Sequence, residues 1–155
     1  ELGFRPLIIT DKQTGDTGEA ARAIAKEIAG DKYSGHNALI IGGETTPTLP
    51  VISGAEGRNQ HYAAVSIREM AGFSGEWTLV SMGTDGSDFL PDVAGAIVDS
   101  SSLAAARKNK PDIEAFIDRF DSNALLAGIG NSLIETGDTG TNVCDIVLYL
   151  IGDKA

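Results

Sequence analysis

Cysteine, long apolar runs and targeting signals are scarce or absent in this chain of 155 residues, and each shortage excludes a class of protein. Its one cysteine, Cys144, rules out a disulfide framework and a cysteine-rich zinc site. We expect Cys144 to be a small buried residue rather than a nucleophile. No apolar run approaches the roughly 20 residues of a membrane helix, and no basic segment followed by an apolar one opens the chain. We therefore expect no membrane contact and a cytoplasmic location.

Basic residues are also few, since 12 lysines and arginines stand against 22 aspartates and glutamates. The net charge of −10 makes the surface acidic. An acidic surface repels phosphate backbones, so we expect no nucleic-acid partner. The length suits one domain, spanning residues 1–155.

Glycine, by contrast, is abundant. Nineteen of the 155 residues are glycine, which exceeds the usual share of about 7%. The glycines cluster in short loops at the ends of apolar runs. Because glycine lets the backbone approach a ligand closely, this pattern is typical of ligand-contacting loops.

The apolar runs predict an alternation of strands and helices. Strands are expected at residues 6–10, 37–41, 77–82, 133–136 and 145–151, with Trp77 as a core anchor, and residues 94–98 fit either a strand or a helix. The early strands are uniformly apolar, which favours a mainly parallel sheet covered on both faces. The last two strands are too close in sequence for a parallel crossover, so they should pair antiparallel. We expect an α/β fold, a three-layer α/β/α domain with a mixed, mainly parallel sheet and an antiparallel C-terminal edge pair.

Three glycine-rich loops follow predicted strands, at residues 42–46, 83–88 and 137–142. In open α/β sheets, ligands bind at the carboxyl ends of the strands. The first loop offers hydroxyls to an oxyanion, and the second, with Asp92, places three carboxylates where Mg²⁺ would suit them. The third suits a nest of N–H groups around an anion. Each loop alone fits an ordinary turn, but the three together predict a site that matches neither a P-loop nor a dinucleotide fingerprint.

Arg58 is the basic residue that stands out. It lies in Gly-Arg-Asn-Gln at 57–60, where a helix is expected to begin, and a cation beside free backbone N–H groups suits a carboxylate or phosphate. The alternative is that Arg58 pairs with a local acid such as Glu56 or Glu44. His61 follows directly, and we expect a surface or hydrogen-bonded histidine rather than a catalytic one.

Six motifs occur in a fixed order, and together they resemble the MOFRL domain, the carboxy-terminal domain of class II glycerate 2-kinases. They are Gly-Gly-Glu-Thr-Thr (42–46), Gly-Arg-Asn-Gln (57–60), Gly-Thr-Asp-Gly-Ser-Asp (83–88), Asp-Val-Ala-Gly-Ala-Ile-Val-Asp (92–99), Asp-Ser (121–122) and Gly-Asp-Thr-Gly-Thr-Asn-Val-Cys-Asp (137–145). The resemblance implies a larger amino-terminal α/β domain and an active site between the two domains. It also implies phosphorylation of the 2-hydroxyl of D-glycerate, with ATP as donor and Mg²⁺ as cofactor.

The resemblance also implies roles for individual residues. Arg58 and Asp85 would be catalytic: Arg58 would hold the glycerate carboxylate or the transferring phosphoryl group, and Asp85 would orient metal or accept the hydroxyl proton. From the chemistry of the loops themselves, we expect Asp85 and Asp88 to hold the metal. The residues expected to bind substrate or phosphate are Gly42, Gly43, Glu44, Thr45, Asn59, Gln60, Thr84, Gly140, Thr141 and Asn142.

The chain departs from the family pattern at several positions. Glu56 and Phe89 stand where glycine is usual, Pro91 replaces a threonine, Asp138 a proline and Cys144 an asparagine. We expect Phe89 to reshape the pocket beside Asp85. Two interpretations follow: one half of a glycerate 2-kinase that is inactive as this isolated chain, or a non-catalytic MOFRL module that binds a sugar acid or a partner chain. A homodimer is left open.

Overall fold

A computed structural model describes residues 2–49, 54–55, 57–90, 92–109 and 112–154. The strands are β1 (Pro6–Gln13), β2 (Ala38–Gly43), β3 (Gly75–Gly83), β4 (Gly95–Asp99), β5 (Leu133–Ile134) and β6 (Asp145–Lys154). The helices are α1 (Thr17–Ala29), α2 (Arg58–Glu69), α3 (Ser102–Asn109), α4 (Ile113–Asp118) and α5 (Ser122–Ile129), with a 3-10 turn at Met70–Gly72. Of residues 94–98, which fitted either type, 95–98 lie in strand β4.

The strands form one mixed sheet in the order β1-β2-β6-β3-β4-β5. β1 and β2 are parallel, and the other neighbouring pairs are antiparallel. The mixed α/β class is thus confirmed, but the expectation of a mainly parallel sheet is wrong. Two strands are the reason: β6 inserts between β2 and β3 and runs against both, and β4 runs against β3 and β5. The expected C-terminal edge pair is also wrong, because β6 lies in the sheet interior and β5 pairs with β4 instead.

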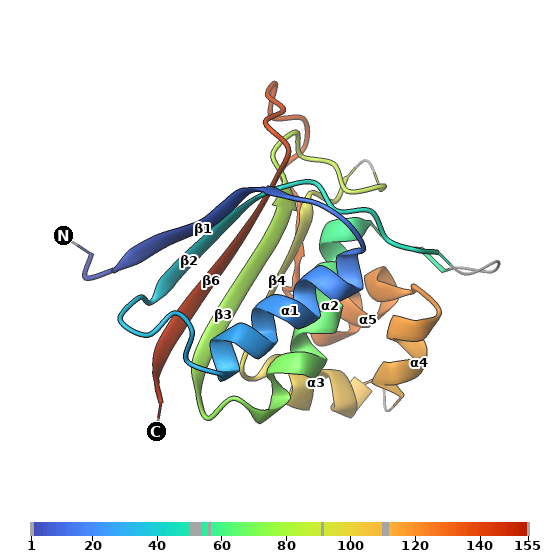
Figure 1. Ribbon diagram of the computed structural model, residues 1–155. Coiled ribbons are helices and arrows are strands. Elements are labelled where there is room, and N and C mark those ends of the chain that lie inside the picture. Colours follow the sequence, from blue (N-terminus) through green and yellow to red (C-terminus); the bar gives the residue numbers. More distant parts are fainter. Residues whose placement is uncertain (1, 50–53, 56, 91, 110–111, 155) are drawn as a thin grey trace.

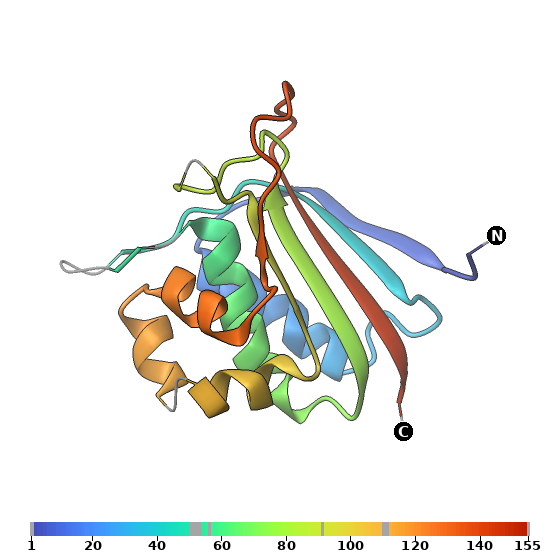
Figure 2. The same ribbon diagram turned by 180° about the vertical axis from the view of Figure 1, so that it is seen from behind.

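The sheet is covered on one face. In both views, every helix of the described chain lies on the same side of the sheet (Figures 1 and 2). The expected three layers are therefore two in the described chain, because the apolar strands are buried on one side only. In β3 the buried residues alternate with half-buried ones, and Trp77 and Leu79 point into the core.

Two helices show why these sequences fold as they do. In α1 the side chain of Asp16 accepts a hydrogen bond from the N–H of Glu19, which caps the first turn. Ala21, Ile24 and Ile28 then recur at helical spacing and are buried. Helix α2 is buried from Asn59 through Ile67 because it packs between the sheet, α1 and α5. Its first turn is therefore held rigidly against the end of the sheet.

No helix in the described part of the chain has the length and apolar character needed to cross a membrane.

Candidate functional site

The three glycine-rich loops meet at one end of the sheet, where β2 and β3 end and β6 begins. β2 ends at Gly43 and β3 ends at Gly83, and both glycines pair with Asp145, the first residue of β6. The loop before β6 contacts the loop after β3, since Thr84 Oγ1 donates to the carbonyl of Cys144 over 2.7 Å. Figure 1 shows these loops together at the top of the molecule. The predicted convergence of the loops is confirmed.

Arg58, the first residue of α2, makes ion pairs with two carboxylates. Its Nε donates to Asp145 Oδ2 over 2.5 Å, and a terminal nitrogen donates to Asp145 Oδ1 over 3.0 Å. Another terminal nitrogen lies 3.0 Å from Glu44 Oε1. The hydrogen bonds to Asp145 raise the pKa of the Arg58 guanidinium. Of the two local acids considered, Glu44 does pair with Arg58, and Glu56 lies outside the described residues.

Asp145 is a site residue that sequence reasoning missed. Its side chain is 8% exposed, and its two carboxylate oxygens each accept a hydrogen bond from a different nitrogen of the Arg58 guanidinium. The forked arrangement fixes the plane and position of Arg58. The sequence contained a signal for Asp145, because this acidic residue ends the 137–145 motif and directly precedes a buried apolar run. An ionised carboxylate in such a position needs a cationic partner.

The side chain of Asp88, thirty residues after the start of α2, caps the amino end of that helix. Oδ1 accepts from the backbone N–H of Asn59 (3.0 Å) and from its side-chain amide (3.3 Å). Oδ2 accepts from the backbone N–H (2.9 Å) and the side-chain amide (3.1 Å) of Gln60. Burial raises the pKa of the Asp88 carboxyl group, and these four donors oppose that shift. The N–H groups expected to be free for a phosphate are therefore already bonded to a carboxylate.

Glycine is required at position 57 by the close approach of Asp88. A Cβ at Gly57 would lie 2.1 Å from Asp88 Cγ and 2.3 Å from the Asp88 carbonyl oxygen. Any side chain at residue 57 would push Asp88 away from the helix. The first residue of the Gly-Arg-Asn-Gln motif is thus a steric requirement of the cap.

Asp85 faces the same cavity as Arg58. The cavity has a volume of about 380 Å³, and Thr45, Gly57 and Phe89 are among the other residues that line it. Asp85 Oδ1 accepts from the backbone N–H of Ser87 (3.0 Å), and Oδ2 accepts from the Asn142 side chain (3.3 Å). Asp85 is half-buried, so its carboxylate remains accessible to a ligand.

The remaining predicted site residues form two groups: buried side chains that hold the loops, and residues on the loops or at strand ends. Asn59 Oδ1 accepts from Ser81 Oγ (2.6 Å), Gln60 Oε1 accepts from Asn123 (2.8 Å), and the hydroxyl of Thr45 accepts from Thr17 (3.0 Å). These side chains are buried and hold the loops in place. The others lie on the loops or their strand ends: Gly42 and Gly43 at the end of β2, Thr84 after β3, and Gly140, Thr141 and Asn142 in the loop before β6.

Two donors of the predicted N–H nest at 137–142, and one donor just beyond it, already have acceptors in the described structure. The N–H groups of Gly140 and Thr141 bond to side chains within the loop, at Asp138 and Thr139. That of Val143 bonds to Thr84 Oγ1. The loop is therefore organised by its own hydrogen bonds.

Three other predictions concern residues near the site or the core. Trp77 is buried as expected. His61 is 3% exposed and stacks on Phe120 with ring centroids 4.2 Å apart, so its place is in the core. The expectation for Cys144 is wrong, because this residue is exposed and adopts a φ of 70° in the loop before β6.

The charges around the cavity sum to a negative value. Arg58 contributes one positive charge, and Glu44, Asp85 and Asp145 are acidic neighbours. Within the described residues no three acidic, histidine or cysteine side chains form a ready-made metal cluster. The oxygens of Asp88 are occupied by four N–H groups, Glu44 pairs with Arg58, and the Asp85 carboxylate is half-buried.

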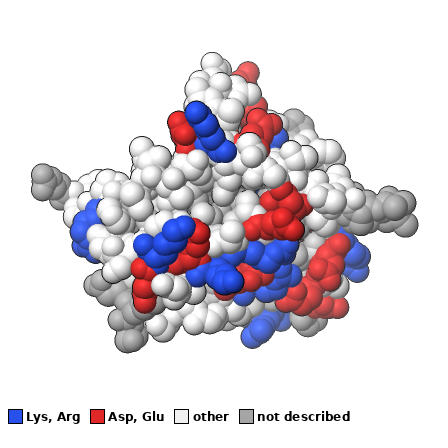
Figure 3. All heavy atoms as spheres, viewed as in Figure 1, with Lys and Arg blue, Asp and Glu red and all other residues white. Residues whose placement is uncertain are grey.

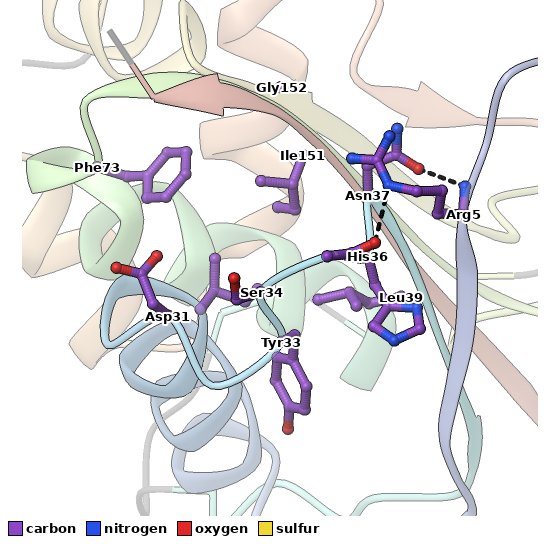
Figure 4. A pocket seen from close by; sticks show the side chains of 12 residues that line it. Arg5, Asp31, Tyr33, Ser34, His36, Asn37, Leu39, Phe73, Ile151 and Gly152 are labelled. Carbon is purple, nitrogen blue, oxygen red and sulfur yellow. Dashed lines mark hydrogen bonds between the residues drawn. The ribbon is translucent and has the colours of Figure 1, made fainter.

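A second cavity, of about 240 Å³, lies at the opposite end of the sheet. Figure 4 shows Arg5, His36 and Asn37 around it, where β2 begins. Arg5 Nε donates to the carbonyl of Gly35 (2.8 Å), and the backbone N–H of Arg5 donates to Asn37 Oδ1 (2.6 Å). These groups bond one another and tie the chain ahead of β1 to the chain ahead of β2.

Known proteins resemble this chain over nearly its whole length. The chain is 34% identical to the glycerate 2-kinase of Pyrococcus horikoshii, across 99% of this chain and 35% of the relative. It is 37% identical to the D-glycerate 2-kinase of Thermotoga maritima, across 97% of this chain and 37% of the relative. The solved glycerate kinase of Thermotoga maritima superposes with a TM-score of 0.86 over 96% of this chain and 36% of its own. The chain thus spans little more than a third of these relatives.

A model of the MOFRL family matches residues 37–145. That stretch contains the row of Gly43, Asp145 and Gly83, together with Arg58, Asp85 and Asp88. The loops, the cavity and the matched stretch coincide, and the chain belongs to the MOFRL family.

Proposed function

We propose that this chain is the MOFRL part of a glycerate 2-kinase and supplies one wall of its active site. The observation that carries the proposal is that Arg58 and Asp85 line one cavity at the loop end of the sheet. That end is open to a second domain, which the longer relatives have the length to contain. We further propose that the isolated chain does not turn over substrate, because the other wall is supplied by that domain.

Phosphoryl transfer depends on positioning and on neutralising charge. Arg58, fixed by Asp145, would hold the carboxylate of D-glycerate or the phosphoryl group in transfer. For this it would exchange its exposed partner, Glu44, for the ligand. Asp85 would orient the 2-hydroxyl and accept its proton as the oxygen attacks the γ-phosphorus of ATP and ADP leaves. Asp85 and Asn142 are hydrogen-bonded, so the carboxylate is already oriented.

Mg²⁺ fits these carboxylates when phosphate oxygens of the substrate complete its coordination. Its usual partners are one or two carboxylates with water and substrate phosphates. Asp85 lines the cavity and Glu44 lies beside Arg58 at its margin, whereas Asp88 is engaged by N–H donors and is left out of the proposed set. The ion would neutralise charge on the transferring phosphoryl group.

Titration of the isolated chain tests the binding half of this proposal. We expect weak binding of D-glycerate that strengthens when Mg²⁺ and ATP are present, because a bare anion enters an acidic cavity unfavourably. Chemical shifts in the loops at 42–46, 84–90 and 137–144 would report it in NMR spectra. The absence of any shift there, with glycerate and ATP–Mg²⁺ together, would count against the site.

A second candidate function rests on Phe89. Phe89 lines the cavity, is 76% exposed and has a φ of 66°, a left-handed conformation that favours the glycine usual in the family. The N–H of Leu90 bonds to the carbonyl of Asp88 across it, over 2.8 Å. A large side chain retained on a strained turn at the rim fits the interpretation of a non-catalytic module that binds a sugar acid or a partner chain.

Replacing Phe89 with glycine distinguishes between the two proposed functions. We expect Phe89→Gly to leave the protein unchanged or stabilise it by up to about 1 kcal/mol, since the strain it relieves exceeds the entropy that glycine loses. The variant should bind glycerate at least as tightly if Phe89 only narrows a kinase pocket. Thermal melting and the same titration measure both effects. Lost binding in a folded Phe89→Gly protein would instead make Phe89 part of a recognition surface.

A further inference from the structure

Two loops that are far apart in the sequence lie against each other beside the candidate site. One follows β3 at residues 84–88 and the other precedes β6 at residues 137–144, and both rise at the top of the molecule in both views (Figures 1 and 2). Gly86 allows their contact, because a Cβ there would lie 1.9 Å from the carbonyl oxygen of Gly137. Gly86 also has a φ of 89°, which favours glycine.

Thr84 binds the second loop with all of its polar groups. Its hydroxyl donates to the carbonyl of Cys144 (2.7 Å) and accepts from the N–H of Val143 (2.8 Å). Its N–H donates to the same carbonyl (3.2 Å), and its own carbonyl accepts from the hydroxyl of Thr139 (2.5 Å). A hydroxyl has one hydrogen to donate. In Thr84 that hydrogen is therefore used to hold the loop before β6.

The same loop holds Asp85 at two points. The N–H of Thr139 donates to the Asp85 carbonyl (3.3 Å), and the Asn142 side chain donates to Asp85 Oδ2 (3.3 Å). The other carboxylate oxygen, Oδ1, accepts from the N–H of Ser87 (3.0 Å). Asn142 is 57 residues from Asp85 in the sequence, so it reaches the carboxylate only while its loop stays in place. The orientation of the carboxylate therefore depends on how this loop is held.

We propose that Thr84 and Thr139, called here the threonine clamp, are positioning residues for Asp85. They hold the loop before β6 against the loop after β3, so that Asn142 fixes which way the Asp85 carboxylate faces in the cavity. The value of that orientation to a ligand rests on the proposed function. The clamp itself is a property of the folded chain and can be tested without a ligand.

The clamp joins neutral groups and should therefore resist salt. Asp138 is the charged residue of 137–144, and Figure 3 shows mostly uncharged surface at the very top of the molecule. Added salt screens exposed ion pairs such as that of Glu44 with Arg58, but has little effect on hydrogen bonds between hydroxyl, amide and carbonyl groups. We expect the loop signals in NMR spectra to be unchanged between low and high salt.

Removing the Thr84 hydroxyl tests the clamp by NMR on the whole chain. Thr84→Val keeps the shape of the side chain, and we expect it to speed amide hydrogen exchange at Val143 by at least about tenfold, because that N–H loses its acceptor. Exchange at Thr139 should also become faster, since the loop is released as a unit. The Ser87 amide and the Asn142 side-chain amide should shift, because both bond to the carboxylate that is no longer held.

Three further variants complete the test. Thr84→Ser keeps the hydroxyl and should retain wild-type exchange. Thr78→Val makes the same change at a half-buried position at the other end of β3, and should leave all of these signals unchanged. Gly86→Ala removes no hydrogen-bonding group but pushes the loops apart, so it should reproduce the shifts of Thr84→Val. Thermal melting would establish that each variant folds.

Titration with D-glycerate in the presence of Mg²⁺ and ATP measures the effect on the site. Thr84→Val and Gly86→Ala should bind at least about tenfold more weakly than wild type, and Thr84→Ser within about twofold of it, because a misplaced polar group loses most of its contribution.

Each contrary result has a separate meaning. Unchanged signals of Thr139 and Asn142 in folded Thr84→Val would overturn the proposal, whether or not the chain binds glycerate. Shifted signals with wild-type affinity would also overturn it, because Asp85 would then need no positioning, and would leave Arg58 in the site. A wild-type chain that binds no glycerate would contradict the proposed function, and the exchange data would still decide whether the clamp exists.

Discussion

Replacing Arg58 with alanine should weaken binding of D-glycerate by at least about thirtyfold, or about 2 kcal/mol. The guanidinium is the positive group of the cavity, and Asp145 holds it in one orientation with two hydrogen bonds. Without it, the charged side chains lining the cavity would all be acidic, namely Asp85 and Asp88. NMR or calorimetric titration in the presence of Mg²⁺ measures the change.

The matched control for Arg58 is on the same helix. Arg68 pairs with Glu69 and Glu114 at the other end of α2, so Arg68→Ala removes an arginine and its ion pairs without touching the cavity. We expect its binding to equal that of wild type. Arg58→Lys keeps the charge but loses the fork to Asp145, and should bind with intermediate affinity. Equal affinity in wild type and folded Arg58→Ala would remove Arg58 from the site.

Asp88→Ala should cost about 3 kcal/mol of unfolding free energy and lower the melting temperature by about 6–12 °C. The change leaves the backbone N–H groups of Asn59 and Gln60 buried without their acceptor, together with both side-chain amides. Thermal or urea unfolding gives the value. The loss would be larger than for an ordinary helix cap because the groups cannot turn to water.

Asp112 provides the comparison for that loss. It is an exposed cap of α4, and its side chain accepts from the N–H of Ala115 over 3.0 Å. Asp112→Ala should cost only about 1 kcal/mol. If Asp88→Ala were no more destabilising than Asp112→Ala, the four-donor arrangement would not be what anchors α2 at the site.

The strands could be predicted because apolar runs are a local property of the sequence, and the convergence of the loops could be predicted because ligand-contacting loops gather where strands end. Apolar runs marked the strands, and glycine clusters marked their ends. The sheet order could not be predicted in the same way. Uniformly apolar strands fit burial on two faces, but here β4 and β6 bury one face under helices and leave Ile97 and Ile146 exposed. The position of β6 depends on pairing across a hundred residues.

The candidate site was also predictable only in part. Arg58 and Asp85 were identified from motifs, and the structure places them on one cavity. The roles of Asp88 and Asp145 depend on contacts 28 to 87 residues distant in sequence, to Gln60 and Arg58. Asp88 was expected to hold metal because acids near one another suggest a cation, but its neighbours in space are N–H donors. Glu56 and Pro91, two of the departures from the family pattern, lie outside the described residues.

The most direct measurement is phosphoryl transfer by a chimera. The chain would replace the matching segment of the Thermotoga maritima D-glycerate 2-kinase, to which it is 37% identical over 97% of its own length. Thermal melting would first establish that the chimera folds, and the relative without this segment would give the background. We predict ATP-dependent phosphorylation of D-glycerate well above that background, lost in Arg58→Ala and kept in Arg68→Ala. A folded chimera that phosphorylates glycerate no faster than the truncated relative would contradict the assignment of this chain as half of a glycerate kinase site.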